Sequence, residues 1–282
     1  DAVNRETTPV DNGIATCLYD GFPTLYMQFS RKAQWVAKPD WYNGIEYVKD
    51  MERGVPYCED LWVPGYFEVP LRKGESVIFS AGVDPVKPAS LKKMYEGEIA
   101  SRTPRTSFYN CLKNAAKQFY VRDGEDMFVI SGFPWGVVLA RNTFMALPGL
   151  TLSLDHFDDY RRIMATALKA LNAFMTEGET HSRLQGIDLP DIPLWAMWAM
   201  QQYDKTEGRE AAAALYADEA GAIADYILDN GHPNLRVDPE TGLLHTLGTS
   251  TPASWMNSML HGRPVIPRSG LLVEFNALWY NA

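Results

Sequence analysis

The sequence predicts an α+β protein with more than one domain, in which a β-sheet region precedes a helical region. Its 282 residues exceed the roughly 100–200 residues of one typical domain. Short aromatic and branched runs fill residues 1–87, whereas apolar residues at helical spacing dominate after residue 88. Hydrophobic residues make up 46% of the chain, so we expect it to form buried cores and not to be disordered.

Residues 1–87 are predicted to form antiparallel strands, because Gly, Pro and Asp separate their apolar runs. The expected strands include residues 17–19, 24–29 and 75–80. Residues 72–75 predict a hairpin turn in which Gly74 adopts a positive φ. We find no candidate catalytic residue in this region.

Residues 88–104 are predicted to be a helical linker, with a helix at about 89–101. Apolar residues then follow one helical stripe over residues 108–119 and another over 157–175. Further helices are expected at about 143–153, 192–206, 209–230 and from 272 to the end, which makes six after residue 105.

Charge and composition exclude several classes of protein. The net charge of −9, with no basic run, argues against a nucleic-acid partner. No apolar stretch approaches the roughly 18 residues that span a bilayer, so we expect a soluble protein with no membrane partner. The 3 Cys and 5 His are scattered, which predicts no metal site and no disulfide framework and favours a cytoplasmic location. We expect no cofactor.

The ends of the chain favour a piece of a longer protein. The sequence opens at Asp1 without Met, and it stops at Ala282 while a helical pattern is still running. We therefore expect that segments of a longer parent chain are missing.

Three aromatic-rich connections are candidate sugar-binding segments. Each places a Trp beside a turn or a helix start and next to polar groups, namely Trp135, Trp195 and Trp255. Indole faces can stack on sugar rings while neighbouring polar groups bind the hydroxyls. For any single Trp, packing in a core is the alternative.

Several motifs follow one another in the second part of the chain. The sequence reads Ser-Gly-Phe-Pro-Trp over 131–135, Arg-Asn-Thr over 141–143, Ala-Leu-Pro-Gly-Leu over 146–150, Asp-Ile-Pro-Leu-Trp over 191–195, Trp-Met-Asn-Ser over 255–258, Gly-Arg-Pro-Val-Ile-Pro-Arg over 262–268 and Val-Glu-Phe-Asn-Ala-Leu-Trp-Tyr-Asn-Ala over 273–282. In this order, the chain from about 105 to 282 resembles the amylo-α-1,6-glucosidase (glycogen-debranching) family.

The resemblance implies a fold in which a β-sandwich precedes an (α/α)6 toroid, a ring of twelve helices. Six helices after residue 105 are about half of such a ring. We therefore expect residues 105–282 to be an incomplete toroid and residues 1–87 to be the C-terminal part of the sandwich. Parts of a full site would then come from the missing segments.

The resemblance also implies inverting hydrolysis of α-1,6-linked glucose in glycogen-like glucans. Such chemistry uses a carboxylic acid and a carboxylate base roughly 6.5–9.5 Å apart. The family's base falls on Glu274, while its acid, in an Arg-Asp-Thr motif, falls on Asn142. Because an amide has no titratable proton near neutral pH, Asn142 cannot be a general acid.

Each of these residues also has a structural explanation. Asn142 suits the N-cap of the helix expected to start at residue 143. Glu274 in a first helical turn interacts favourably with the helix dipole, and Asp191 could be the N-cap ahead of Pro193. The three arginines that flank the candidate site could instead form surface ion pairs.

The candidate site comprises two catalytic positions and a set of sugar-binding ones. The catalytic positions are Glu274 and Asn142, and the substrate-binding set is Trp135, Arg141, Asp191, Trp195, Trp255, Asn257, Arg263 and Arg268. The first hypothesis is a debranching-type glycoside hydrolase, or a fragment of one, that acts on an α-glucan or a branched oligosaccharide. The second is a carbohydrate-binding relative that has lost turnover, and the third is a plain helical scaffold.

Overall fold

The computed structural model describes residues 3–134, 136–247, 252–266 and 268–282. The chain divides into two compact units, Asp1–Thr103 and Pro104–Ala282. Within the described residues the architecture is mixed, with eight α-helices and several small sheets. No helix in these ranges combines the length and the apolar character needed to cross a membrane.

The first unit contains a four-stranded antiparallel sheet. Its strands, in spatial order, are β1 (Thr7–Val10), β2 (Gly13–Thr16), β3 (Leu25–Phe29) and β6 (Phe79–Gly82). Gly13 is required at the β2–β3 pairing, because a Cβ there would lie 1.9 Å from the carbonyl oxygen of Met27. The side chain of Gln28 is buried, and its amide bonds backbone groups of Asp11 and Val86.

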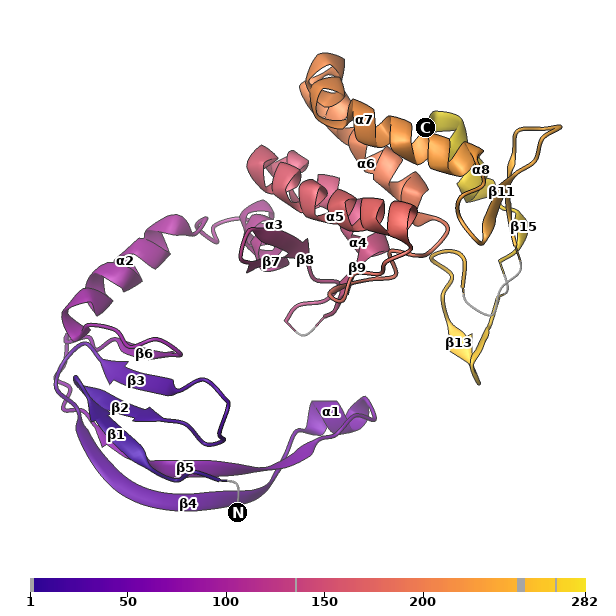
Figure 1. The fold of residues 1–282 in the computed structure, drawn as a ribbon. Helices are drawn as coiled ribbons and strands as arrows, with labels where there is room; N and C mark the ends of the chain where they lie inside the picture. The colour runs from indigo at the N-terminus through magenta and orange to yellow at the C-terminus, as the bar shows by residue number, and fades with distance from the viewer. Residues whose placement is uncertain (1–2, 135, 248–251, 267) are drawn as a thin grey trace. The chain divides into compact units, whose positions relative to one another are not determined.

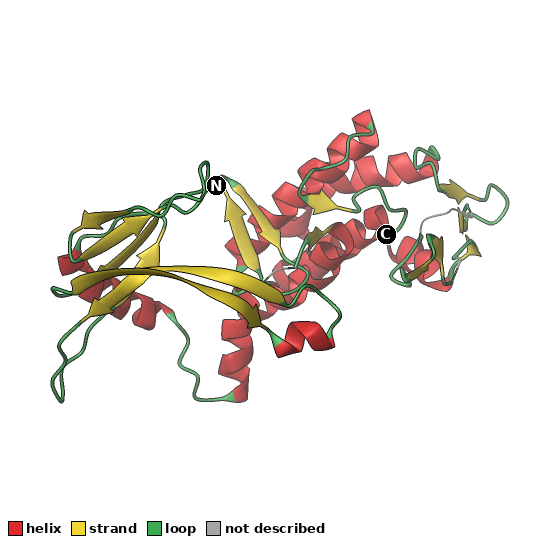
Figure 2. Cartoon of the chain, turned by 90° about the horizontal axis from the view of Figure 1, so that it is seen from below, coloured by secondary structure: helices red, strands yellow, loops and turns green. Residues whose placement is uncertain are grey.

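A long two-stranded ribbon accompanies this sheet, formed by β4 (Gln34–Glu46) and β5 (Cys58–Glu68) with α1 (Val48–Glu52) between them. Figure 2 shows the two long, curved strands. The ring of Phe67 lies 4.9 Å from that of Phe29 in β3 and 4.8 Å from that of Trp35, centroid to centroid. The two sheets therefore meet through aromatic rings, while the complete β-sandwich stays a prediction.

The expected strands of this unit have mixed outcomes. Residues 24–29 are confirmed as β3, but the strand expected at 75–80 begins only at Phe79. The expectation of a strand at 17–19 is wrong, because Tyr19 forms only an isolated bridge with Val3 and the chain then turns, with the Phe22 N–H donating to the Tyr19 carbonyl.

The turn at residues 72–75 forms, but it does not join a hairpin. Glu75 donates its N–H to the carbonyl of Arg72 over 3.0 Å, and Gly74 has a φ of +89°. The flanking strands β5 and β6 lie in different sheets, since β5 pairs with β4 and β6 pairs with β3. The turn therefore connects two sheets. A 3-10 helix, η1 (Pro88–Ser90), and α2 (Leu91–Ser101) complete the unit.

The second unit is mainly helical, and the six helices expected after residue 105 are present. They are α3 (Phe108–Lys117), α4 (Ala140–Leu150), α5 (Phe157–Glu177), α6 (Ile192–Glu207), α7 (Arg209–Leu228) and α8 (Val273–Asn281). Short connections join α4 to α5, through residues 151–156, and α6 to α7, through the single residue Gly208 with a φ of +92°. Figure 1 shows α5 and α7 in front of α4 and α6. Closure of these layers into a toroid stays a prediction.

Short strands and one further 3-10 helix connect the helices of this unit. They are β7 (Tyr120–Asp123), β8 (Asp126–Val129), β9 (Val138–Leu139), η2 (Leu152–Leu154), β10 (Leu184–Gln185), β11 (Leu235–Val237), β12 (Leu244–Thr246), β13 (Met259–Leu260), β14 (Arg263–Pro264) and β15 (Gly270–Leu271). One small sheet has the order β11-β12-β15, so the strand that leads into α8 pairs with β12.

The core of the second unit is formed by the inward faces of these helices. Phe144 and Leu147 of α4 and Leu171 of α5 are each 0% exposed, and full burial of such a side chain contributes about 1.5–3 kcal/mol. The rings of Tyr160 and Tyr203 stack 5.2 Å apart, and the Tyr160 hydroxyl donates to the carbonyl of Ala199. Burial raises the pKa of Tyr160, so this hydroxyl keeps its proton as a donor.

Candidate functional site

Three helices of the second unit begin at the same end of one layer. Arg141, in the first turn of α4, bonds Asp191, the residue just before α6. Farther along α6, the Gln201 side chain donates to the carbonyl of Asn281, near the end of α8. The start of α8 bonds β12, which pairs with β11, and His232 just before β11 bonds Asp188 ahead of α6. The starts of α6 and α8 therefore lie toward the same end, as do those of α4 and α6, and the positive ends of the three helix dipoles point the same way.

A buried ion pair joins the starts of α4 and α6. The Asp191 carboxylate accepts from Nε of Arg141 over 2.5 Å and from its Nη2 over 2.9 Å, and Trp195 Nε1 donates to it over 3.2 Å. The two charged side chains are only 8% and 3% exposed. We call these three residues the Arg141–Asp191–Trp195 cluster.

Burial raises the pKa of Asp191, and the hydrogen bonds from Arg141 and Trp195 oppose that shift. The bidentate contact with a permanently charged guanidinium favours the ionised carboxylate. Asp191 occupies the N-cap position of α6, ahead of Pro193, as expected, but its side chain makes no capping bond. Its carboxylate connects two helices.

Asn142 lies in the first turn of α4 and is exposed. The N-cap of α4 is Leu139, so the expectation that Asn142 caps this helix is wrong. The helix starts earlier than its apolar pattern indicates, and Thr143 donates its hydroxyl to the Leu139 carbonyl over 2.9 Å. Asn142 shares its exposed face with Met145, one turn farther along.

Glu274 is the second residue of α8, in the first turn as expected. An Nη2 hydrogen of Arg268 is donated to its Oε1, while Nη1 of Arg268 lies 3.5 Å from the sulfur of Met256. The side chains of Arg268 and Glu274 are 20% and 28% exposed. The carboxylate is thus held by a cation and still reaches solvent.

The remaining predicted sugar-binding residues differ in their exposure. Trp195 is half-buried and contacts Trp198 edge to face at 5.6 Å, whereas Trp255 is 55% exposed. Asn257 and Arg263 are exposed, the latter on β14. Trp135 lies outside the described residues. The contacts thus gather five of the predicted residues into the Arg141–Asp191–Trp195 cluster and the Arg268–Glu274 pair.

His232 also stabilises the end of the second unit at which α6 begins, a role that its sequence context does not predict. The side chain is 1% exposed, and Nδ1 accepts the N–H of Asn234 over 3.0 Å. Nε2 must then carry the proton, and it donates to the carbonyl of Asp188 over 3.0 Å. His232 thereby connects the loop after α7 to the loop that leads to Asp191. A single His has no spacing pattern from which such a role is predictable.

Replacement of His232 with Gln is expected to flatten the pH dependence of stability in mildly acidic solution. Burial lowers the pKa of His232, and the hydrogen bond to Asp188 only partly opposes that shift. The unfolded chain therefore takes up the proton first, so the stabilisation is complete above about pH 6.5 and is lost as the pH falls from there. Urea unfolding at several pH values would measure this effect. An identical loss in the unaltered protein and the variant would contradict it, and His261→Gln, at an exposed position, is the control.

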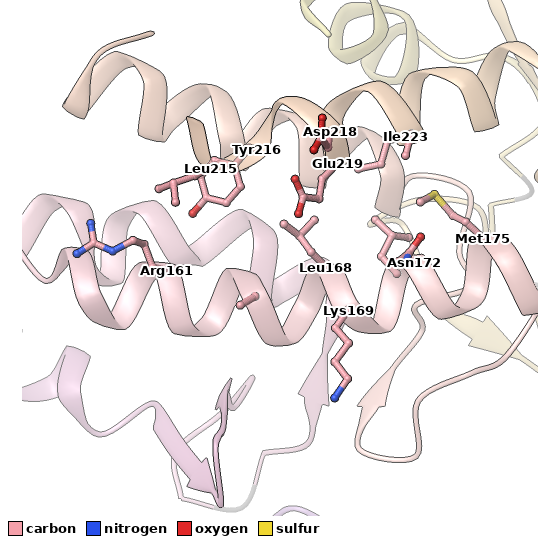
Figure 3. Close-up of a pocket in the computed structure, with 13 residues that line it drawn as sticks. Arg161, Leu168, Lys169, Asn172, Met175, Leu215, Tyr216, Asp218, Glu219 and Ile223 are labelled. Atoms are coloured by element: carbon pink, nitrogen blue, oxygen red, sulfur yellow. The ribbon is translucent and has the colours of Figure 1, made fainter. Parts of the chain in front are cut away.

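An open groove of about 690 Å³ lies elsewhere, between α5 and α7. Figure 3 shows Leu168 and Asn172 of α5 facing Glu219 and Ile223 of α7. None of the predicted site residues that the structure describes lines this groove. Across the described ranges, no group of three or more His, Cys, Asp or Glu residues is arranged to hold a metal ion.

Comparison with known proteins gives two family matches along the chain. A family model described as "Glycogen debranching enzyme N terminal" matches residues 1–78, and one described as "Amylo-alpha-1,6-glucosidase" matches residues 114–282. The second match contains all the predicted site residues. No curated protein and no solved structure matches the chain.

Proposed function

Because the chain belongs to the amylo-alpha-1,6-glucosidase family of glycogen debranching enzymes, we propose that it binds α-1,6-linked glucose in a glycogen-like glucan and acts on the glycosidic bond by inverting hydrolysis. The family domains are of the glycoside hydrolase type, and the family implies a glucan substrate.

The observation that carries the proposal is the common end at which α4, α6 and α8 begin. Asn142, Asp191 and Glu274 each lie at the start of one of these helices. Inverting hydrolysis needs groups on both sides of the glycosidic bond. Helix starts that share an end support such an arrangement.

In the proposed reaction, Glu274 accepts a proton from a water molecule, and the oxygen of that water attacks the anomeric carbon. The bond to the leaving oxygen breaks with its electron pair, and that oxygen requires a proton. The family's donor position holds Asn142, whose amide can bond the oxygen but cannot protonate it. Cleavage of an ordinary glycosidic bond should therefore be slow.

The other predicted residues divide into two roles. Trp195 and Trp255 supply ring faces for sugar stacking, and Asn257 and Arg263 supply exposed polar groups for hydroxyls. Trp135 joins this set by the family motif alone. The side chains of Arg141 and Asp191 are occupied by each other, so we assign them to holding the starts of α4 and α6.

A second candidate function is α-glucan binding without turnover. Asn142 favours it, because this one side chain removes the proton donor while leaving the exposed aromatic and polar groups in place. The two functions differ in whether Glu274 still activates water.

Hydrolysis of α-glucosyl fluoride distinguishes inverting hydrolysis from α-glucan binding without turnover. Fluoride leaves without protonation, so a protein with a base and no acid should release β-glucose, which proton NMR of the fresh product identifies. Binding of isomaltose by calorimetry with no fluoride release would favour the second function. Release of α-glucose would exclude inversion, and no binding at millimolar sugar would leave only a helical scaffold.

A further inference from the structure

Two side-chain contacts, made by Arg268 and Asn276, hold the first turn of α8 from two sides. On one side, Arg268 bonds the Glu274 carboxylate. On the other, Asn276 bonds the backbone of β12, 32 residues earlier in the chain. Both contacts involve the first turn of the helix that carries the proposed base.

Asn276 uses both ends of its amide. Its Oδ1 accepts the N–H of Leu244 over 2.8 Å, and its Nδ2 donates to the carbonyl of Leu244 over 3.1 Å and to that of Leu272 over 3.0 Å. A helix turns about 100° per residue, so Asn276 and Glu274, two positions apart, point to nearly opposite sides. Asn276 therefore fixes the rotation of the turn about its axis while Glu274 faces away from β12.

The strand that leads into α8 is fixed to β12 as well. Thr246 of β12 donates its hydroxyl to the carbonyl of Gly270 over 3.1 Å, and β15 pairs with β12 at this point. Farther along α8, Trp279 Nε1 donates to the carbonyl of Gly242 over 3.1 Å. The β11–β12 hairpin thus sets the position of α8, and Arg268 in addition orients the Glu274 carboxylate.

Arg268 faces the protein and not only solvent. Nη2 bonds Glu274, Nη1 contacts the sulfur of Met256, and Nε is buried without a partner among the described residues. A guanidinium with this placement can orient one carboxylate and keep it charged. A residue that bound sugar hydroxyls through the same nitrogens would have to give up these contacts.

From these contacts we propose that Arg268 and Asn276 are positioning residues for Glu274. Arg268 sets the orientation and charge of the carboxylate, and Asn276 sets the turn that carries it. The inference rests on the proposed function in taking Glu274 as the base. It also revises the expectation that Arg268 binds sugar.

Arg268→Gln is expected to lower kcat for α-glucosyl fluoride by about 10–100-fold with little change in KM, because a misaligned base loses rate and not affinity. The acidic limb of the activity profile should move to higher pH, since the cation that favours the charged carboxylate is gone. Arg268→Lys should recover part of both effects. A raised KM with an unmoved acidic limb would instead make Arg268 a sugar ligand, and Arg183→Gln, at an exposed ion pair, is the control.

Asn276→Ala is expected to lower kcat in the same way while isomaltose binding changes little. Asn276→Asp keeps the acceptor for the Leu244 N–H but loses both donated bonds, so its kcat should lie between those of the unaltered protein and Asn276→Ala. It is the variant to use where the Ala variant does not fold. Asn281→Ala is the matched control, because among the described residues its side chain bonds only the carbonyl of Ala277, within α8, over 2.7 Å. Equal losses in Asn276→Ala and Asn281→Ala would overturn the role of Asn276.

A double-mutant cycle makes the inference testable without activity. Unfolding of Arg268→Gln, Glu274→Gln and the double variant should show a loss in the double variant smaller than the sum of the single losses. Additive losses would overturn the pairing even if α-glucosyl fluoride is hydrolysed. Non-additive losses without any hydrolysis would retain the pairing and reject the proposed function.

Discussion

Replacement of Asn142 with Asp is expected to raise glucose release from a branched dextrin by roughly 10²–10⁴-fold, the usual contribution of a general acid. Asp supplies the proton that the leaving oxygen needs, and only one side-chain group changes. The position is exposed, so the carboxyl can reach a bound sugar without displacing core residues. A reducing-sugar or glucose assay on the purified protein measures the gain.

The substitution should leave folding intact. Position 142 is the third residue of α4, where a negative charge interacts favourably with the helix dipole by about 0.3–1 kcal/mol. Asn110→Asp, at the third residue of α3, is the matched control for the added charge and should not change activity. Glu274→Gln in the Asn142→Asp protein should remove the gain, and an unaltered protein as active as Asn142→Asp would mean that the acid lies elsewhere.

Replacement of Asp191 with Asn is expected to lower the free energy of unfolding by about 3–5 kcal/mol, because it leaves the Arg141 charge buried without its counter-ion. Arg141 is 7% exposed, so water cannot take over the role of the carboxylate. The hydrogen bond from Trp195 also loses its charged acceptor. Urea unfolding followed by tryptophan fluorescence measures the loss.

Two further variants test the cause of that loss. Asp158→Asn breaks an ion pair with Arg161 in which Asp158 is 90% exposed, and such pairs contribute only about 0–1 kcal/mol. Replacing Arg141 with Met and Asp191 with Leu together removes both charges and should recover much of the stability. Similar losses for Asp191→Asn and Asp158→Asn would show that burial of the Arg141 charge is not the cause.

The helices of this chain were predictable because their apolar periodicity is local. The stripe over residues 157–175 corresponds to α5, and the pattern from 272 onward corresponds to α8. The start of α4 was placed too late, because Arg141 is a buried charged residue that interrupts the apolar pattern. The strand at 75–80 started late in the structure, since residues 75–78 lead from the turn into β6.

The candidate site was predictable in its residues but not in their partners. The family motifs indicated Glu274 and Asp191, yet they gave no sign that Asp191 bonds Arg141, 50 residues earlier. The bonds from Asn276 to β12 are equally long-range, and such contacts follow from packing and not from local spacing. His232 was missed for the same reason.

The separate environments of two neighbouring residues in α4 have an evolutionary consequence. Arg141 is enclosed and paired, whereas Asn142 is open to solvent. Drift at the second position therefore carries little penalty for the architecture, and codons for Asn and Asp differ by one base. Under the proposed function, a single nucleotide change is enough to remove or restore the proton donor, and the surrounding scaffold stays the same.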